Sequence, residues 1–177
     1  MKALGPLYRV ALAVILLDQF TKWLVVQFLD LKTRGVIIVV DPLLIFRMAW
    51  NRGINFGIFS DQGDLMRWVL IGGAVVICLW VIWWMWRDKP GVWVQTSAGL
   101  VVGGAIGNVI DRVVYGAVAD FLNMSCCGWE NPWSFNVADI AIFVGAIGLI
   151  FLTSDAPKEI PQEKDGRAFA PRLHASR

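Results

Sequence analysis

The chain has only one histidine in 177 residues, His174, which stands close to the C-terminal end. A Ser–His or Cys–His nucleophile system needs an imidazole base beside the nucleophile, and the rest of the chain offers none. Cysteine is also scarce. Cys78 lies within an apolar run, and Cys126 and Cys127 are adjacent, which is not the spacing of zinc ligands. These shortages argue against a histidine-dependent hydrolase and against a cysteine-bound metal, and we assign no role to the adjacent cysteines.

Charged residues are sparse as well, at 17% of the chain, whereas 57% of the residues are hydrophobic and there are ten Trp and ten Phe. Long apolar runs of this kind are not expected in a soluble domain. A transmembrane helix needs about 20 mostly apolar residues, and four segments come near that length. We therefore predict a mainly α-helical membrane protein, a bundle of four transmembrane helices at about 8–29, 68–86, 91–110 and 133–153.

The distribution of basic residues predicts the orientation, because short cytoplasmic loops carry an excess of Lys and Arg. The loop from 113 to 133 has none, so we place it outside the cytoplasm. Both termini are then expected to be cytoplasmic, although the first outer loop, 30–67, also carries basic residues. The basic residues on the side assigned to the cytoplasm are Lys2, Arg9, Arg87, Lys89, Lys158, Lys164, Arg167, Arg172 and Arg177.

Residues 1–153 are expected to form a single integral membrane domain. The tail 154–177 is rich in Pro, Lys, Glu and Asp without apolar periodicity, which predicts a disordered cytoplasmic extension. The first outer loop contains VIIVV and LLIFRMAW on either side of Asp41-Pro42, a pattern of short strands joined by a turn. We predict a small β-sheet on the outer face at about 34–60. The alternative is a hydrophobic hairpin dipping into the bilayer, against which the charges of Arg47 and Arg52 argue.

Three of the predicted spans carry polar residues at helical spacing. Ionisable groups at membrane depth are costly and persist mainly where they pair or take part in chemistry. In the predicted orientation these polar faces lie toward the outer ends of their helices, so they can converge. They consist of Asp18 and Lys22 in the first span, Asn108, Asp111 and Arg112 in the third, and Asn136 and Asp139 in the fourth.

The aspartates in and near these spans differ in whether a basic residue lies close to them in the sequence. Asp18 and Asp111 each have a basic neighbour, which keeps the pKa of a carboxylate down and favours a role in holding helices together. Asp120, in the loop after the third span, and Asp139 have none nearby. Two carboxylates close together in a partly desolvated site cannot both ionise easily, so one keeps its proton and the other acts as a base. Asp120 and Asp139 are therefore the candidate pair for activating water against an amide, and Asp111 remains an alternative.

Other functions are compatible with the same residues. A Ser–Lys dyad formed by Ser134 and Lys22 is one, although Asp18 on the same helix face would raise the pKa of the lysine and weaken it as a base. A small transporter or proton carrier is a second, since intramembrane charges suit it equally well. A non-catalytic membrane assembly protein is a third. Crowding of the polar groups in the outer half, without an inverted repeat, argues against the carrier.

The glycines of the third span have a packing interpretation. Gly99, Gly103 and Gly107 recur every four residues, and Ala141 and Gly145 repeat this spacing in the fourth span. Small residues at this interval let membrane helices approach closely. No strand precedes them in the register of a dinucleotide-binding loop, so we predict helix contacts here and no nucleotide site.

Five short motifs occur along the chain: DQFTK at 18–22, NRGINF at 51–56, GNVIDR at 107–112, VADF at 118–121 and FNVAD at 135–139. With these motifs in this order, the chain resembles the lipoprotein signal peptidases, or signal peptidase II, a family of bacterial inner-membrane aspartic peptidases. The resemblance runs from about residue 16 to residue 142. One departure is INF at 54–56, where the family commonly has smaller residues after asparagine-x-glycine.

The resemblance implies a role for each matching residue. Asp120 and Asp139 would be the catalytic dyad, and Asp18 and Lys22 a structural polar pair. The residues that would orient the dyad and the substrate are Asn51, Gly53, Asn108, Asp111, Arg112 and Asn136.

The resemblance also implies a fold and an activity. The fold would be a four-helix bundle with an outer β-cradle and a short surface helix, in the bacterial inner membrane with the active site near the periplasmic face. The activity would be cleavage of diacylglyceryl-modified prolipoproteins on the amino side of the lipidated cysteine, with water as nucleophile and without metal or organic cofactor. The expected partners are these substrates and membrane lipids, with no nucleic acid, and the expected state is a monomer.

Overall fold

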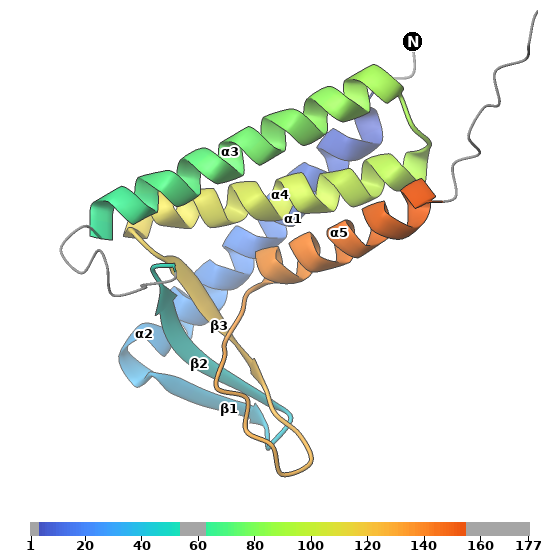
Figure 1. The fold of residues 1–177 in the computed structure, drawn as a ribbon. Coiled ribbons are helices and arrows are strands. Elements are labelled where there is room, and N and C mark those ends of the chain that lie inside the picture. The colour runs from blue at the N-terminus through green and yellow to red at the C-terminus, as the bar shows by residue number, and fades with distance from the viewer. Residues whose placement is uncertain (1–3, 54–62, 155–177) are drawn as a thin grey trace, which may run out of the picture.

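The structure is a computed structural model that describes residues 4–53 and 63–154. Helices and strands follow one another in a mixed order, with a small sheet assembled from two separate parts of the chain (Figure 1). The elements are α1 Gly5–Lys22, the π-helical η1 Trp23–Phe28, α2 Leu31–Arg34, β1 Val36–Val40, β2 Leu44–Asn51, α3 Gly63–Asp88, α4 Val92–Tyr115, β3 Val118–Met124 and α5 Val137–Ser154.

The helices form a bundle in which α4 packs against α1, α3 and α5 (Figure 1). Three helical segments are long and apolar enough to cross a membrane, at Gly5–Phe28, Asp64–Asp88 and Val92–Tyr115, and α5 contributes a shorter apolar helix. The mainly helical prediction is thus confirmed. The fourth helix begins at Val137, later than the predicted 133, because its first residue is fixed by a polar cap at Asn136.

The predicted small-residue contacts are confirmed on α4, which lies very close to α1. A Cβ atom at Gly103 would stand 2.7 Å from the carbonyl oxygen of Ala11, and one at Gly107 would stand 2.8 Å from Oδ2 of Asp18. A side chain at either position would push the two helices apart. The second contact matters for function, because the close approach at Gly107 brings a buried carboxylate of α1 against α4.

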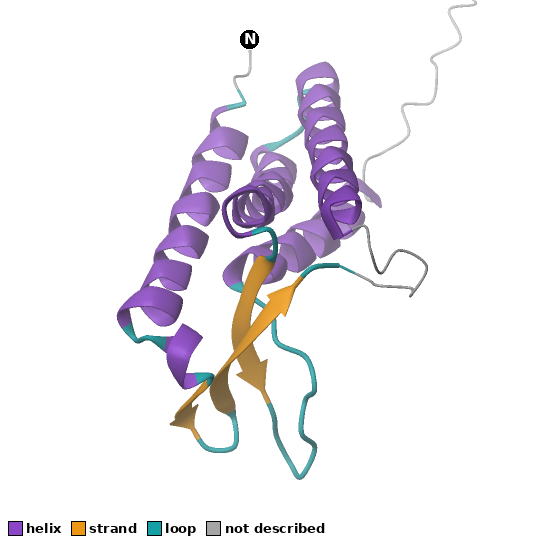
Figure 2. Cartoon of the chain, turned by 90° about the vertical axis from the view of Figure 1, so that its left-hand side faces the viewer, coloured by secondary structure: helices purple, strands orange, loops and turns teal. Residues whose placement is uncertain are grey.

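The sheet has the antiparallel order β1-β2-β3 and lies beyond one end of the bundle (Figures 1 and 2). The predicted sheet is confirmed for β1 and β2, which form a hairpin rather than dipping among the helices. The rest of the predicted region, 54–60, lies outside the described residues. The third strand, β3, falls in a segment that the sequence predicted as a loop. It forms because β2 offers it a backbone edge, with Ala49 opposite Asp120 and Asn51 opposite Val118.

An apolar cluster attaches β3 to the end of the first helix. Val25 and Val26 of η1 and Leu31 of α2 are buried against Ala119 and Phe121 of β3. Burial of apolar area is the main force available at this end of the molecule, where the chain leaves the bundle. The cluster therefore fixes β3 relative to α1, and with it the side chain of Asp120 that the strand carries.

Candidate active site

Asp139 is held at the start of α5 by a reciprocal cap. The side-chain oxygen of Asn136 accepts a hydrogen bond from the backbone N–H of Asp139 at 2.9 Å, and the carboxylate of Asp139 accepts one from the backbone N–H of Asn136 at 3.3 Å. This is a capping box, in which two unpaired backbone donors at a helix start are satisfied together. The motif FNVAD therefore begins a helix and at the same time fixes the direction of a carboxylate.

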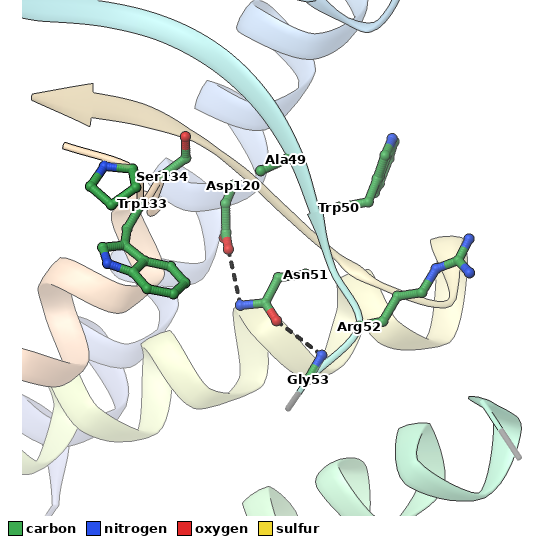
Figure 3. Close-up of a pocket in the computed structure, with 9 residues that line it drawn as sticks. Ala49, Trp50, Asn51, Arg52, Gly53, Asp120, Trp133 and Ser134 are labelled. Carbon is green, nitrogen blue, oxygen red and sulfur yellow. Dashed lines mark hydrogen bonds between the residues drawn. The ribbon is translucent and has the colours of Figure 1, made fainter. Parts of the chain in front are cut away.

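Asp120 is positioned by the sheet. Its strand partner is Ala49, and Asn51, two residues further along β2 on the same face, donates a hydrogen bond from Nδ2 to Oδ2 of Asp120 at 3.0 Å (Figure 3). The side-chain oxygen of Asn51 in turn accepts a hydrogen bond from the backbone N–H of Gly53 at 3.0 Å. Gly53 has φ +94°, a left-handed conformation that suits glycine, so the motif NRG forms a turn that orients Asn51.

The electrostatic setting of Asp120 favours its protonated form. Only 3% of its surface is exposed. Burial, followed by the negative charge of Asp139, raises the pKa of Asp120 from 3.8 to about 6, against the hydrogen bonds from Asn51 and Asn136 that favour the carboxylate. A carboxyl in this state can hold a proton close to neutral pH and release it during a reaction.

Asn136 connects the two carboxylates. Its Nδ2 donates to Oδ1 of Asp120 at 2.6 Å, while the rest of its polar atoms cap α5 and contact Asp139. Asn108 of α4 completes the ring, because its Nδ2 donates to Oδ1 of Asp139 at 2.8 Å and its Oδ1 accepts from Asn136 at 3.2 Å. One amide side chain from each of two helices thus holds Asp120 and Asp139 in a common network, as the predicted convergence requires.

A second charged cluster, here called the lysine triad, lies beside this network and consists of Asp18, Lys22 and Asp111. Nζ of Lys22 stands 2.7 Å from a carboxylate oxygen of each aspartate. Both aspartates are fully buried and Lys22 is 4% exposed. Gln19 adds a hydrogen bond to each carboxylate, at 3.2 Å and 3.0 Å, which ties α1 to α4. The expected Asp18–Lys22 pair is confirmed and gains a third member.

The lysine triad supports both carboxylates of the network through the backbone. Oδ1 of Asp18 accepts a hydrogen bond from the backbone N–H of Ala138, the residue before Asp139, at 3.0 Å. Oδ2 of Asp111 accepts one from the backbone N–H of Ala119, the residue before Asp120, also at 3.0 Å. The triad thus holds the two chain segments from which Asp120 and Asp139 project. Sequence reasoning missed this role, because Asp18 and Ala138 are 120 residues apart and the bond from Ala119 to Asp111 depends on how the chain turns from α4 into β3.

One expectation about a cation is wrong. Arg112 does not neutralise Asp111, which pairs with Lys22 instead; within the described parts of the chain Arg112 forms no ion pair. Adjacent residues on a helix point in different directions, so Asp111 turns toward α1 while Nη1 of Arg112 donates to the carbonyl of Asn108 at 3.1 Å. The contacts do not support the Ser–Lys alternative, because the hydroxyl of Ser134 donates to the carbonyl of Arg47 and Lys22 is held by two carboxylates.

Two cavities adjoin the network, one at each carboxylate. The outer pocket, of about 600 Å³, reaches Asp120 and opens beside the sheet (Figure 3). The α5 cleft, of about 360 Å³, reaches Asp139. The outer pocket is lined among others by Trp50, Asn51, Arg52, Asp120, Trp133 and Ser134, and the α5 cleft by Phe135, Asp139, Ile140 and Phe143.

This arrangement can support general acid–base chemistry on a bound molecule. Two carboxylates share a hydrogen-bond network, at least one has a raised pKa, and both border open space. In the described residues, no group of three or more His, Cys, Asp or Glu side chains is placed to hold a metal ion. Cys126 and Cys127 lie exposed in the loop after β3.

Comparisons with known proteins show which family the chain is similar to. A family model described as signal peptidase (SPase) II matches residues 10–154. The lipoprotein signal peptidase of Methylobacterium sp. (strain 4-46) is 40% identical over 158 residues, which cover 88% of this chain and 94% of the relative. That of Rhizorhabdus wittichii is 39% identical over 145 residues, covering 81% and 82%. That of Burkholderia pseudomallei (strain 668) is 38% identical over 153 residues, covering 84% and 87%.

The fold is also similar to solved structures. Two structures of bacterial membrane enzymes determined by the in meso method are each 26% identical in sequence to this chain, with TM-scores of 0.69 and 0.73. They cover 88% and 86% of this chain, and the aligned parts make up 93% and 94% of their own lengths. The family match includes most of α1, the other three long helices and the whole sheet. The chain therefore belongs to the signal peptidase II family of bacterial membrane peptidases.

Proposed function

We propose that Asp120 and Asp139 form the catalytic dyad of an aspartic peptidase that removes the signal peptide from diacylglyceryl-modified prolipoproteins. The observation that carries the proposal is the pair of carboxylates joined through Asn136, both bordering cavities, with the pKa of Asp120 raised to about 6. The names of the relatives, lipoprotein signal peptidases, support this substrate class.

The proposed reaction is direct hydrolysis. The ionised carboxylate takes a proton from water while the water oxygen bonds to the scissile carbonyl carbon, and the protonated carboxyl donates its proton to the carbonyl oxygen. The tetrahedral intermediate then collapses: the carboxyl that took the water proton donates it to the leaving amine, the C–N bond breaks, and a hydroxyl proton of the intermediate returns to the other carboxylate. The raised pKa of Asp120 supports this residue as the one that holds the proton at rest. Its burial, at 3% exposure against a half-buried Asp139, supports the same assignment.

The supporting residues fall into two groups in this proposal. Asn51, Asn108 and Asn136 hold the dyad directly, and Gly53 sets the turn that orients Asn51. Arg112 keeps guanidinium N–H groups available for a carbonyl of the substrate, and its charge interacts with both dyad carboxylates. The lysine triad positions the dyad through the backbone and does not touch the substrate. Water is the nucleophile, so the proposal needs no metal or organic cofactor.

The proposed placement in the membrane has both termini in the cytoplasm and the dyad near the periplasmic face of the inner membrane. The beginning of α1, the α3–α4 connection and the end of α5 lie at one end of the bundle, and the sheet lies at the other, which supports this orientation (Figure 1). Arg87 and Lys89, near the α3–α4 connection, agree with a cytoplasmic location. Residues 1–153 would then be one membrane domain acting as a monomer, with 154–177 as a cytoplasmic tail, of which 155–177 lie outside the described residues.

The experiment that tests the proposal is cleavage of a diacylglyceryl-modified prolipoprotein in detergent by the wild type, Asp120→Asn and Asp139→Asn. We expect each variant to lose at least about 10³-fold in turnover, in the range of general acid–base contributions, and to melt near the wild-type temperature. The folding control is essential, because loss of both activity and structure would not identify a dyad. Near wild-type cleavage by either variant would contradict the assignment and direct attention to Asp111.

A further inference from the structure

The two cavities at the dyad differ in chemistry. The outer pocket is mixed, because Asn51, Arg52 and Ser134 supply polar groups and Trp50, Pro132 and Trp133 supply apolar walls. Among the described residues that line the α5 cleft, Asp139 contributes a polar side chain and Phe135, Ile140 and Phe143 form apolar walls. The described linings of the two cavities have no residue in common, and that of the α5 cleft is the more uniformly apolar. A volume of about 360 Å³ falls in the range of about 300–1,000 Å³ that small-molecule sites occupy.

The α5 cleft lies on an exposed apolar surface of α5. Phe143 is 67% exposed and Ile140 is 40% exposed, and Val144 and Ile147 continue the same apolar surface along α5. Exposed apolar side chains on a spanning helix contact lipid tails. Phe143 follows Asp139 by four residues, which corresponds to about 6 Å along the helix. The cleft is thus an apolar path from the bilayer to one dyad carboxylate.

We propose that the α5 cleft receives the acyl chains of the lipidated cysteine of the substrate. This inference rests on the proposed function. In that substrate the lipid is attached to the residue just after the scissile bond, so its chains begin a few bonds from the carbonyl that the dyad attacks. The α5 cleft lets the chains remain in an apolar medium while the cysteine backbone stands at Asp139. In the outer pocket, the same chains would meet Arg52 and Asn51.

The cleft acts by positioning rather than by adsorbing the lipid. A chain that leaves the bilayer for an apolar cleft gains little transfer energy, because lipid tails and leucine-like side chains are similarly apolar. What the walls provide is orientation of the scissile carbonyl relative to the dyad, and misplacement by about 1 Å can cost about 10²-fold in rate. Changes in the cleft should therefore lower kcat/KM without unfolding the protein.

The first experiment identifies the residues next to the lipid. A prolipoprotein peptide with a photoreactive diazirine on the first carbons of its acyl chains is bound to full-length Asp120→Asn and illuminated, and the labelled residues are found by mass spectrometry. We expect label on residues 135–143, competed by unlabelled substrate. The alternative is the apolar groove of about 200 Å³ between α3 and α4, lined by Cys78, Leu79 and Val109 among others. Label there, or label that substrate does not displace, overturns the inference.

The second experiment compares two matched positions on α5. Phe143 and Phe151 are 67% and 69% exposed, but Phe151 lies about 12 Å further toward the cytoplasmic end and does not line the cleft. We expect Phe143→Ala to lower kcat/KM for a dipalmitoyl substrate about tenfold. The kcat/KM of this variant for a diacetyl substrate should be little affected. Phe151→Ala should leave the ratio of kcat/KM for the dipalmitoyl substrate to kcat/KM for the diacetyl substrate at its wild-type value. If the wild type and both variants have the same ratio, the inference is overturned.

The proposed function and the inference about the acyl chains can fail separately. If the wild type cleaves neither substrate, the proposed function is wrong and the α5 cleft loses its proposed ligand. If the wild type cleaves the dipalmitoyl substrate but the cleft is not labelled, the peptidase assignment stands and only the inference about the acyl chains is wrong.

Discussion

The lysine triad and the network that holds Asp120 and Asp139, here called the dyad network, are neighbouring clusters of aspartates. The two clusters are built in opposite ways. In the triad, two fully buried carboxylates share one ammonium at 2.7 Å each and accept backbone or glutamine hydrogen bonds. In the dyad network, Asp120 and Asp139 are held by asparagine amides, and among the described residues neither forms an ion pair. Both also border cavities, whereas the triad is enclosed.

The difference separates structural from reactive carboxylates. A carboxylate that is buried and held by a cation is suited to fixing helices, because its oxygen atoms are already occupied. An amide neighbour orients a carboxylate without cancelling its charge, which leaves burial and the negative charge of Asp139 to raise the pKa of Asp120 and favour its protonated form. The comparison predicts that changes in the triad act first on stability, and changes in the dyad network act first on turnover.

The largest effect is expected from Lys22→Met. It leaves Asp18 and Asp111 buried without their cation, and breaking a buried ion pair in this way costs about 3–5 kcal/mol. We expect a much lower melting temperature in detergent and a loss of activity that follows the loss of folded protein. Asp120→Asn is the control that should keep its melting temperature. A Lys22→Met protein that melts like the wild type would show that the triad does not hold the fold.

Asn136→Ala sharpens the comparison, because Asn136 belongs to both the helix cap and the dyad network. Losing an N-terminal cap costs about 0.5–2 kcal/mol, so the variant should remain folded. With Asp120 and Asp139 no longer joined, we expect kcat to fall by roughly 10–100-fold. Asn131→Ala, which removes an asparagine from the loop after β3, should retain most of its turnover. Equal losses in the two variants would remove the specific role of Asn136.

Arg112→Lys should impair turnover by about tenfold while it preserves the charge. The guanidinium donates to the carbonyl of Asn108 and has further N–H groups in a planar arrangement, which an ammonium cannot reproduce. Arg67→Lys is the matched control, because Arg67 also donates to a backbone carbonyl, that of Val113 at 2.9 Å. Steady-state kinetics on the lipidated substrate measure both variants. If Arg112→Lys turns over at the wild-type rate, Arg112 does not orient the substrate.

The smallest effect is a shift in pH dependence. With the pKa of Asp120 near 6, the dyad loses its proton as pH rises through that value, so kcat/KM should decline on the alkaline side. The amide of Asn51 stabilises the carboxylate form, so Asn51→Leu should raise the pKa of Asp120 and move this decline to higher pH, by less than about one pH unit. A profile that stays in place or moves to lower pH would contradict Asp120 as the proton-holding residue.

The sequence predicted the helices and the hairpin because their signals are local. Apolar runs of the required length identify the spanning helices, and the β-rich pattern around Asp41-Pro42 identifies β1 and β2. Helical spacing also predicted that polar faces converge, and the structure joins Asn108, Asn136 and Asp139 in one network. Asp120 was singled out by the absence of a neighbouring cation, although its strand was not predicted.

What the sequence determined by itself is therefore the set of membrane helices and the reactive groups available to them, because hydropathy and residue type are properties of short segments. Only the tertiary structure decided which charges meet. Asp111 pairs with Lys22 across 89 residues rather than with the adjacent Arg112, since helix geometry turns neighbouring side chains apart while close packing at Gly107 brings α1 against α4. β3 likewise exists only because β2 offers it an edge, and that strand carries Asp120 to Asn136.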